Sequence, residues 1–476
     1  MLGLASLASF IVILDVMVVA TALTAIRRHL GASLADLEWT VNAYTLSFAV
    51  LLMTAAALGD RLGRRRVFAA GLVLFAVSSA GCALAPGAAA LIAARALQGA
   101  GAATVMPMSL ALLNGAFPAA RRGWAIGIYG GVTALAAVAG PVLGGAVTQG
   151  LGWQWIFWLN VPVALAAVPL VLSRISEATG PGGAVDLPGL VLVSTAALGL
   201  VWGLVRGNTA GWGSPEVIGT LACGAAAATA FAAWERRAAR PMLPARLFRS
   251  AAFSAGNIAI FVINASLTGA IFLMPQYLQV VAGQDPLGAG LRLLPWGIAP
   301  FLVGPRAGAL ADRVGERALV VTGAILQAAG AGWIAAAAGP GTGYPALVPP
   351  MTIIGVGFAL AIPAVTRSVT STVPPADIGT ASAAFTTMRQ LGGAFGVALL
   401  GAAFAVTGSY ATPAAFSHGF TTAFAVAAAL ALTGAAAGAI LAGRETIRHP
   451  PGRASRAAVS ATVVARDPAA PDATLR

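Results

Sequence analysis

The sequence predicts an all-α protein that crosses a membrane many times, and its composition supports this fold class directly. Hydrophobic residues make up 58% of the 476 positions and charged residues only 9%, whereas soluble domains carry roughly 25% charged residues. Apolar runs of about 20 residues recur from end to end, and each is long enough to span a bilayer as a helix. A membrane β-barrel would need short alternating strands, which are not visible.

Fourteen apolar runs follow one another along the chain, and each is predicted to form one transmembrane helix. The runs cover residues 3–26, 39–58, 67–84, 88–113, 125–146, 156–173, 187–205, 216–234, 253–279, 288–305, 318–338, 346–366, 380–407 and 414–442. The loops between them therefore alternate between the two sides of the membrane.

These loops also alternate in charge. The chain has no lysine, so its basic residues are 28 arginines. With the N-terminus inside, 22 arginines fall in inner loops or the C-terminal tail, and only Arg27, Arg28 and Arg206 fall in outer loops. Asp36 and Glu38 are expected in the same outer loop as the first two, where they offset the charge. The positive-inside rule therefore predicts a plasma-membrane protein with both termini cytoplasmic. It also explains the net charge of +13 without a nucleic-acid partner.

One charged motif occurs twice. LGDRLGRRR (58–66) joins the second and third runs, and LADRVGERA (310–318) joins the tenth and eleventh. Both loops are predicted to be cytoplasmic, so the copies share one orientation, as in parallel repeats. Two plain six-helix halves would place the copies six runs apart, but the spacing is eight, which leaves two extra helices between the halves. The predicted parts are a six-helix bundle at 1–175, a linker with two extra helices at 176–250, a second six-helix bundle at 251–443 and a disordered cytoplasmic tail at 444–476.

Several motifs together carry a family resemblance. GALADRVGER (308–317) matches a known transporter loop motif in full, and the first copy has Ala56 in place of the leading glycine. RALQGAGAA (95–103), AGPVLGG (139–145) and LDVMVVATAL (14–23) are similar to a helix-4 arginine motif, a helix-5 antiporter motif and a helix-1 motif. With these motifs in this order, the chain resembles the major facilitator superfamily, in its fourteen-helix drug:proton antiporter branch (EmrB/QacA type).

The resemblance implies two bundles that rock against each other and export drug-like or amphipathic small molecules in exchange for protons. The expected partners are an amphipathic or cationic substrate, protons and membrane lipid. The transporter is expected to be a monomer that uses the proton gradient and no cofactor. A proton-coupled exporter or importer of one metabolite is the alternative, because fold does not dictate substrate. An enzyme or ATP-driven pump is not expected, since a chain without lysine cannot contain the phosphate-binding loop G-x-x-x-x-G-K-[ST] and shows no metal-ligand spacing.

Asp15 and Arg95 are charged residues inside the predicted membrane core. Asp15 falls near the middle of the first run, where a charge costs about 2.5–3.5 kcal/mol on insertion scales and marks a functional candidate. Burial and a nearby arginine would oppose each other there, so Asp15 could load and unload protons; alternatively it is a neutral acid bonded to a neighbouring helix. Arg95 could pair with the first helix, relay charge or extend to the surface. The resemblance implies proton coupling for both.

The repeated motif predicts a cytoplasmic gate of which each half carries one part. A carboxylate beside arginines accepts charge-assisted hydrogen bonds, and the glycines allow a tight turn. The alternative is a topology signal in a solvated loop. The candidate gate residues are Asp60, Arg61, Gly63 and Arg64 in the first copy and Gly308, Asp312, Arg313, Gly315 and Arg317 in the second.

The fifth run holds Gly140, Pro141, Gly144 and Gly145. Glycines four residues apart share a helix face and permit close helix approach, while proline bends the helix. The resemblance implies an antiporter helix that forms a sealed, pivoting wall; generic packing is the alternative.

Polar residues within the apolar runs are candidates to line a substrate cavity. Each could instead satisfy an interhelical hydrogen bond, and the arginine among them could extend to the cytoplasmic surface. The candidates are Asn42, Tyr44, Gln98, Asn257, Asn264, Gln276, Gln279 and Arg389.

Overall fold

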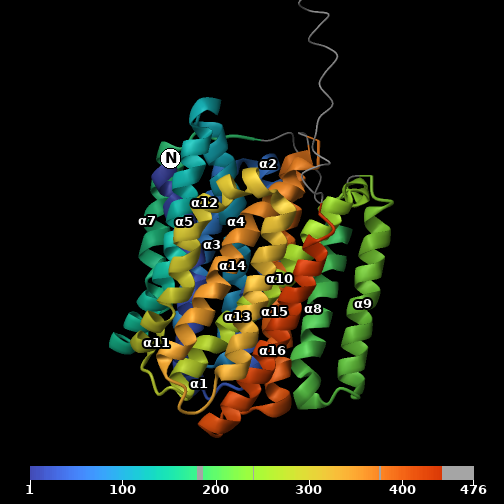
Figure 1. Ribbon diagram of the computed structural model, residues 1–476. Coiled ribbons are helices and arrows are strands. Elements are labelled where there is room, and N and C mark those ends of the chain that lie inside the picture. The colour runs from blue at the N-terminus through green and yellow to red at the C-terminus, as the bar shows by residue number, and fades with distance from the viewer. Residues whose placement is uncertain (180–185, 240, 375–376, 442–476) are drawn as a thin grey trace, which may run out of the picture.

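The computed structural model describes residues 1–179, 186–239, 241–374 and 377–441, and the regular elements in these ranges are all helices. Fourteen helices of the described chain are long and apolar enough to cross a membrane, which confirms the predicted number. They run side by side in one bundle (Figure 1). The predicted tail at 444–476 lies outside the described residues, as does part of the 176–250 linker.

The helices follow the predicted order, and two of the spans are interrupted. The first half holds α1 (Leu2–Leu30), α2 (Leu34–Leu62), α3 (Arg64–Ala83), α4 (Ala88–Ala116), α5 (Ala119–Gly150) and a sixth span made of α6 (Trp155–Trp158) and α7 (Asn160–Arg174). The extra pair is α8 (Leu187–Ala210) and α9 (Pro215–Glu235). After the short helix η1 (Ala245–Arg249), the second half holds α10 (Ala251–Val280), α11 (Pro286–Arg292) with α12 (Leu294–Val314), α13 (Glu316–Ala337), α14 (Tyr344–Ser371), α15 (Ile378–Thr407) and α16 (Pro413–Gly438).

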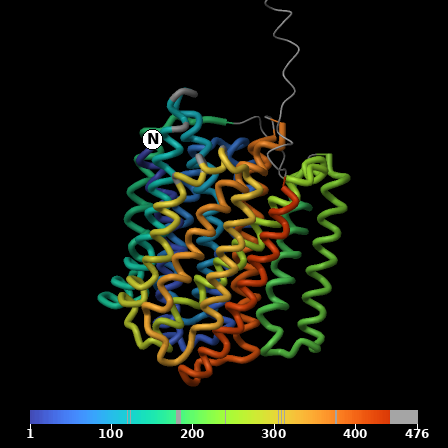
Figure 2. The backbone as a smooth tube through the Cα atoms, in the orientation of Figure 1, coloured from blue at the N-terminus to red at the C-terminus, as the bar shows by residue number. Residues whose placement is uncertain are grey.

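The extra pair stands at the edge of the bundle (Figure 2). Helix α8 packs on α2 and α15, one helix from each half, and α9 packs on α8. The two added helices therefore cover the outside of a contact between the halves and do not enter the core.

Most helices extend beyond the apolar runs that predicted them, and α2 shows why. Its run begins at residue 39, but Ser33 and Asp36 form a capping box in which each side chain accepts a hydrogen bond from the other's backbone N–H, and this starts the helix at Leu34. Glu38, expected in an outer loop, is therefore a buried helix residue. That expectation was wrong.

The two ends of the bundle are packed differently. We call the end where α2 meets α3 and α12 meets α13 the motif end, and the other the opposite end. At the opposite end one hydrophobic cluster joins both halves, with Leu23 and Phe157 from the first half and Tyr277, Phe404 and Phe420 from the second. Toward the motif end each half has its own buried cluster, and the other half contributes partly buried residues at its margin, Met53 to one cluster and Ala383 to the other. The halves are therefore sealed together at the opposite end.

Candidate functional site

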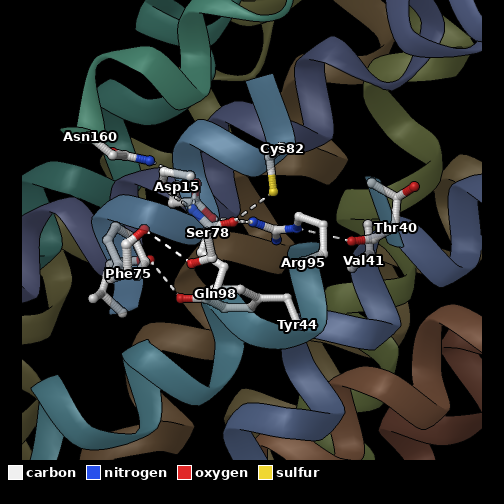
Figure 3. A network of polar contacts seen from close by, with 12 residues as sticks. Asp15, Thr40, Val41, Tyr44, Phe75, Ser78, Cys82, Arg95, Gln98 and Asn160 are labelled. Atoms are coloured by element: carbon white, nitrogen blue, oxygen red, sulfur yellow. Dashed lines mark hydrogen bonds and ion pairs between the residues drawn. The ribbon is translucent and has the colours of Figure 1, made fainter. Parts of the chain in front are cut away.

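The Asp15 carboxylate lies halfway along α1, is 0% exposed and accepts hydrogen bonds from three side chains (Figure 3). Arg95 of α4 forms a short ion pair with Asp15 Oδ2. Gln98 Nε2 and Asn160 Nδ2 each donate to Oδ1 at 2.9 Å. A carboxylate in hydrocarbon thus has a complete set of donors from α4 and α7.

Arg95 is as deeply buried as its partner, at 1% exposure. Its Nε donates to Thr40 O of α2 at 3.1 Å, its Nη1 donates to Gln98 Oε1 at 2.6 Å, and its guanidinium carbon lies 4.3 Å from the Tyr44 ring centroid. Of the roles left open by the sequence, pairing with the first helix is the one that the geometry supports. Gln98 and Tyr44, predicted to line a cavity, belong to this buried network instead.

The glycines of the helix-4 motif bring these groups together. A Cβ on Gly99 would lie 2.2 Å from Tyr44 O, and one on Gly101 would lie 2.8 Å from Phe75 N. Because neither carries a side chain, the backbone of α4 can approach α2 and α3 closely. This approach carries Arg95 within reach of Thr40 O.

The ion pair couples α4 to α1. A buried guanidinium without a counterion is strongly disfavoured, so Arg95 depends on the Asp15 carboxylate for its place in the network.

The first copy of the charged motif is mostly helical, not a loop. Asp60 lies in the last turn of α2, and Arg64, the first residue of α3, donates from Nε and Nη2 to Asp60 Oδ1 at 2.9 and 2.7 Å. Only Gly63 separates the two helices, and its φ of 104° is a backbone angle that residues with a side chain rarely adopt. Arg61 lies on the surface.

A residue that the motif did not include completes this end. Glu177, after the sixth span, accepts from Arg65 N at 2.9 Å and lies 3.7 Å from Nε of both Arg65 and Arg66. A Cβ on Gly63 would lie 2.6 Å from Glu177 Cδ. The glycine therefore provides both the turn and the space for the carboxylate.

The second copy has the same single-glycine turn, at Gly315 with φ of 88°. The next residue, Glu316, pairs with Arg367 at 3.1 Å. Arg313 and Arg317 lie on the surface. Gly308 and Asp312 lie in α12, and the surroundings of Gly308 and of the Asp312 side chain are not among the described features.

A further pair near this end ties the segment before α10 to α15. Arg246 donates two hydrogen bonds to Asp377, and this guanidinium holds the pKa of the Asp377 carboxyl below its usual value. Each of the motif-end ion pairs named above joins residues of one half, or joins one half to the segment directly after or before it. A gate that joins the halves in another conformation stays a prediction.

The helix-5 motif lies at the opposite end, within the seal. A Cβ on Gly140 would lie 2.3 Å from Met17 Cβ, and one on Gly144 would lie 2.7 Å from Val18 Cα, so both glycines face α1. Gly145 faces the other half, where its Cβ would lie 2.3 Å from Pro286 O. This motif thus permits backbone contact within one half and between the halves.

The pattern of the Major Facilitator Superfamily matches residues 5–397 and again 257–469. The chain belongs to the major facilitator superfamily. It is 37% identical over 393 residues to the tetracenomycin C resistance and export protein of Streptomyces glaucescens, covering 82% of this chain and 73% of that one. It is also 37% identical to the cephamycin export protein of Amycolatopsis lactamdurans, over 86% and 85% of the two chains, and 34% identical to a puromycin resistance protein of Streptomyces alboniger, over 89% and 87%.

Solved structures of this superfamily's fold agree with the observed architecture. A POT family transporter in complex with 5-aminolevulinic acid superposes with a TM-score of 0.71 at 14% identity, covering 91% of this chain and 94% of that one. The xylose transporter XylE from E. coli gives a TM-score of 0.59 at 16% identity, over 90% and 95%. The predicted family and fold, a multi-pass transporter and not an enzyme, are confirmed.

The residues of α10 that were predicted to line a cavity donate hydrogen bonds to backbone carbonyls. Asn264 Nδ2 donates to Arg389 O at 2.7 Å, and Asn257 Nδ2 donates to a carbonyl of its own helix at 2.8 Å. Gln279 Nε2 crosses to the other half and donates to Thr21 O at 3.0 Å, within the seal. Gln276, which accepts from the Tyr410 hydroxyl, is also at the opposite end.

Two further candidates lie on α2 and α15, helices of different halves that pack on each other. Asn42 is 0% exposed on α2. Arg389 on α15 is half-buried, and no carboxylate among the described residues lies within ion-pair distance of it. It interacts electrostatically with Tyr129 of α5, whose hydroxyl accepts from Ser9 at 2.6 Å. The guanidinium therefore has no carboxylate counterion among the described residues.

Proposed function

We propose that this protein exports drug-like amphipathic small molecules across the plasma membrane in exchange for protons, by alternating access. The observation that carries the proposal is the Asp15–Arg95 ion pair, because ionisable residues within a membrane span are costly and mark a functional site by default. Relatives named for export or resistance support the direction of transport.

In this proposal the motif end is cytoplasmic, as the arginine distribution indicates. The seal at the opposite end then makes the present conformation inward-facing. Protonation of Asp15 releases Arg95, which alters the packing of α4 against α1 and α2 and favours the next step of the cycle. A cationic substrate does not compete for Asp15 in this conformation, because Arg95 occupies that place.

The proton gradient supplies enough free energy for this exchange. One proton crossing 100 mV releases about 2.3 kcal/mol, and each pH unit adds about 1.4 kcal/mol. One or two protons per cycle would support a substrate ratio from tens to thousands. No cofactor is needed, and a monomer suffices because one chain contains both halves.

The direct test uses purified protein in liposomes with an imposed pH gradient and two fluorescent amphipathic probes, cationic ethidium and anionic carboxyfluorescein. Gradient-driven movement of either probe, absent from protein-free liposomes, is the expected result. Cells that lack the gene should accumulate more of the transported probe. Lower accumulation would identify an importer, and no movement of either probe would favour a transporter of one specific metabolite.

Replacing Arg389 by Gln is expected to change the charge preference of export. A guanidinium without a counterion repels cations and attracts anions in a medium of low dielectric constant. The ratio of ethidium to carboxyfluorescein export should rise about tenfold in Arg389→Gln and stay near the original value in Arg389→Lys. Arg206→Gln is the matched control, because Arg206 is exposed and paired with Glu216. Equal loss of both probes in Arg389→Gln would exclude a role in charge selection.

A further inference from the structure

The contact between α2 and α15 contains a second buried carboxylate that the proton-coupling network does not use. Residues 38, 42, 46 and 49 share one face of α2 by helical spacing. Leu46 packs with residues of α15, and Ala49 O accepts a hydrogen bond from Thr387 of α15. This face therefore meets the second half, and Glu38 lies on it at the opposite end.

Glu38 lies directly against the backbone of α15. It is 2% exposed, and a Cβ on Gly401 would lie only 2.0 Å from Glu38 Oε1 and 2.5 Å from Cδ. The absence of a side chain on Gly401 therefore creates the place where the carboxyl group rests. This place exists only while the two halves are in contact.

Three polar side-chain atoms on this face lack hydrogen-bond partners. Glu38 Oε2 and both polar side-chain atoms of Asn42 are buried without a hydrogen-bond partner among the described residues. Asp15 differs from Glu38, because its carboxylate accepts hydrogen bonds from three side chains. An ionised carboxylate without water, donor or cation is strongly disfavoured, and a neutral acid far less so.

No arginine among the described residues forms an ion pair with Glu38. Arg27 of α1 forms no ion pair with it, and the guanidinium carbon of Arg27 lies 4.1 Å from the ring centroid of Tyr410. Arg95 of α4 is paired with Asp15, and Arg206 of α8 is paired with Glu216. Tyr410 lies near both Arg27 and Glu38, and its phenol stays neutral because burial raises its pKa.

We infer that Glu38 is a second proton-binding site, occupied while the opposite end is sealed and emptied to water when α2 and α15 separate there. The inference rests on the proposed alternating access but concerns a different carboxylate. Sealing then requires one proton to bind from the opposite side, and opening breaks the Glu38 O–H bond and transfers that proton to water. Because the sealed state binds the additional proton, acid favours sealing and rising pH favours opening.

The test measures opening of the opposite end against pH in the full-length protein. Spin labels on Leu84→Cys and Val406→Cys report the distance between the halves, because both residues are exposed at that end on different halves. The exposed Cys223 is replaced by Ser. Between about pH 5 and about pH 9, the ratio of open to sealed protein should rise at least tenfold in the parent. In Glu38→Gln it should stay low and change less than about twofold.

Two controls make the result specific. Glu216→Gln removes a carboxylate of the extra helices, which is exposed and paired with Arg206, and should keep the full pH response. In the spin-labelled protein with Asp15→Asn, opening should still depend on pH. Adding Glu38→Gln to this variant should abolish that pH dependence. Gly401→Ala displaces the carboxyl group from its place and should raise the open fraction at about pH 5.

An unchanged pH response in Glu38→Gln would overturn the inference while leaving export and the Asp15 mechanism intact. A parent protein that stays sealed at every pH would overturn it as well, together with the alternating access on which it rests. Loss of gradient-driven export in Asp15→Asn with a normal Glu38-dependent response would support both proposals separately.

Discussion

Asp15→Asn is expected to abolish proton-driven export, with a loss of at least about 100-fold in the rate driven by a pH gradient. Asparagine fills nearly the same space and accepts hydrogen bonds but cannot carry a proton on and off. Counterflow, in which labelled and unlabelled substrate exchange without a gradient, should be reduced much less. The measurement is therefore the ratio of gradient-driven export to counterflow in liposomes.

Stability must be controlled, because the substitution leaves Arg95 buried without a counterion. Removing one partner of a buried ion pair costs about 3–5 kcal/mol, whereas neutralising both partners costs far less. Asp15→Asn with Arg95→Gln should therefore fold better than Asp15→Asn alone and remain uncoupled. Asp36→Asn replaces a partly exposed aspartate outside the Asp15 network, at the start of α2, and should export normally because asparagine can also accept the hydrogen bond from Ser33 N. Gradient-driven export at the parent rate in the single variant would remove Asp15 from the mechanism.

The sequence was sufficient to predict the fold because each apolar run is long enough to span a bilayer as a helix, independently of its tertiary contacts. The prediction from apolar runs ended several helices too early, because a helix can continue through charged residues beyond the hydrocarbon. Asp60 and Arg61, expected in a loop, lie in the last turn of α2. At the other end of that helix, the pair Ser33 and Asp36 was a local capping signal that could have placed Glu38 in the helix.

The candidate site was predictable only in part, for a physical reason. Asp15 and Arg95 stand out because a charge in hydrocarbon is costly wherever its partners are. Their partners Thr40 and Asn160 come from other helices, and no sequence spacing reveals that contact. Asn160 was detectable as a polar residue in an apolar run, but polarity alone does not separate a cavity-lining group from one that bonds to a neighbour. Gln98 illustrates this, since it was predicted for a cavity and bonds to Asp15.

Gly145→Ala is expected to prevent closure of the opposite end and so to lower transport about 5- to 150-fold, the range that corresponds to a penalty of about 1–3 kcal/mol for overpacking. The added Cβ would lie 2.3 Å from Pro286 O and 2.8 Å from Leu287 Cα. Both are backbone atoms of the other half, so they cannot move aside as a side chain can. The halves must instead separate at this contact, which disfavours the sealed conformation but not the folding of either half.

The measurement that isolates this effect is chemical labelling of a buried position inside the seal. Val19 is 1% exposed within the hydrophobic cluster that joins the halves, so Val19→Cys should react with a membrane-impermeant maleimide only when the opposite end opens. Gly145→Ala should raise that rate, measured with Cys223→Ser as background. Gly130→Ala is the matched control on the same helix, because nothing lies within 4 Å of its added Cβ. Equal labelling and transport in the two alanine variants would show that the Gly145 contact does not control closure.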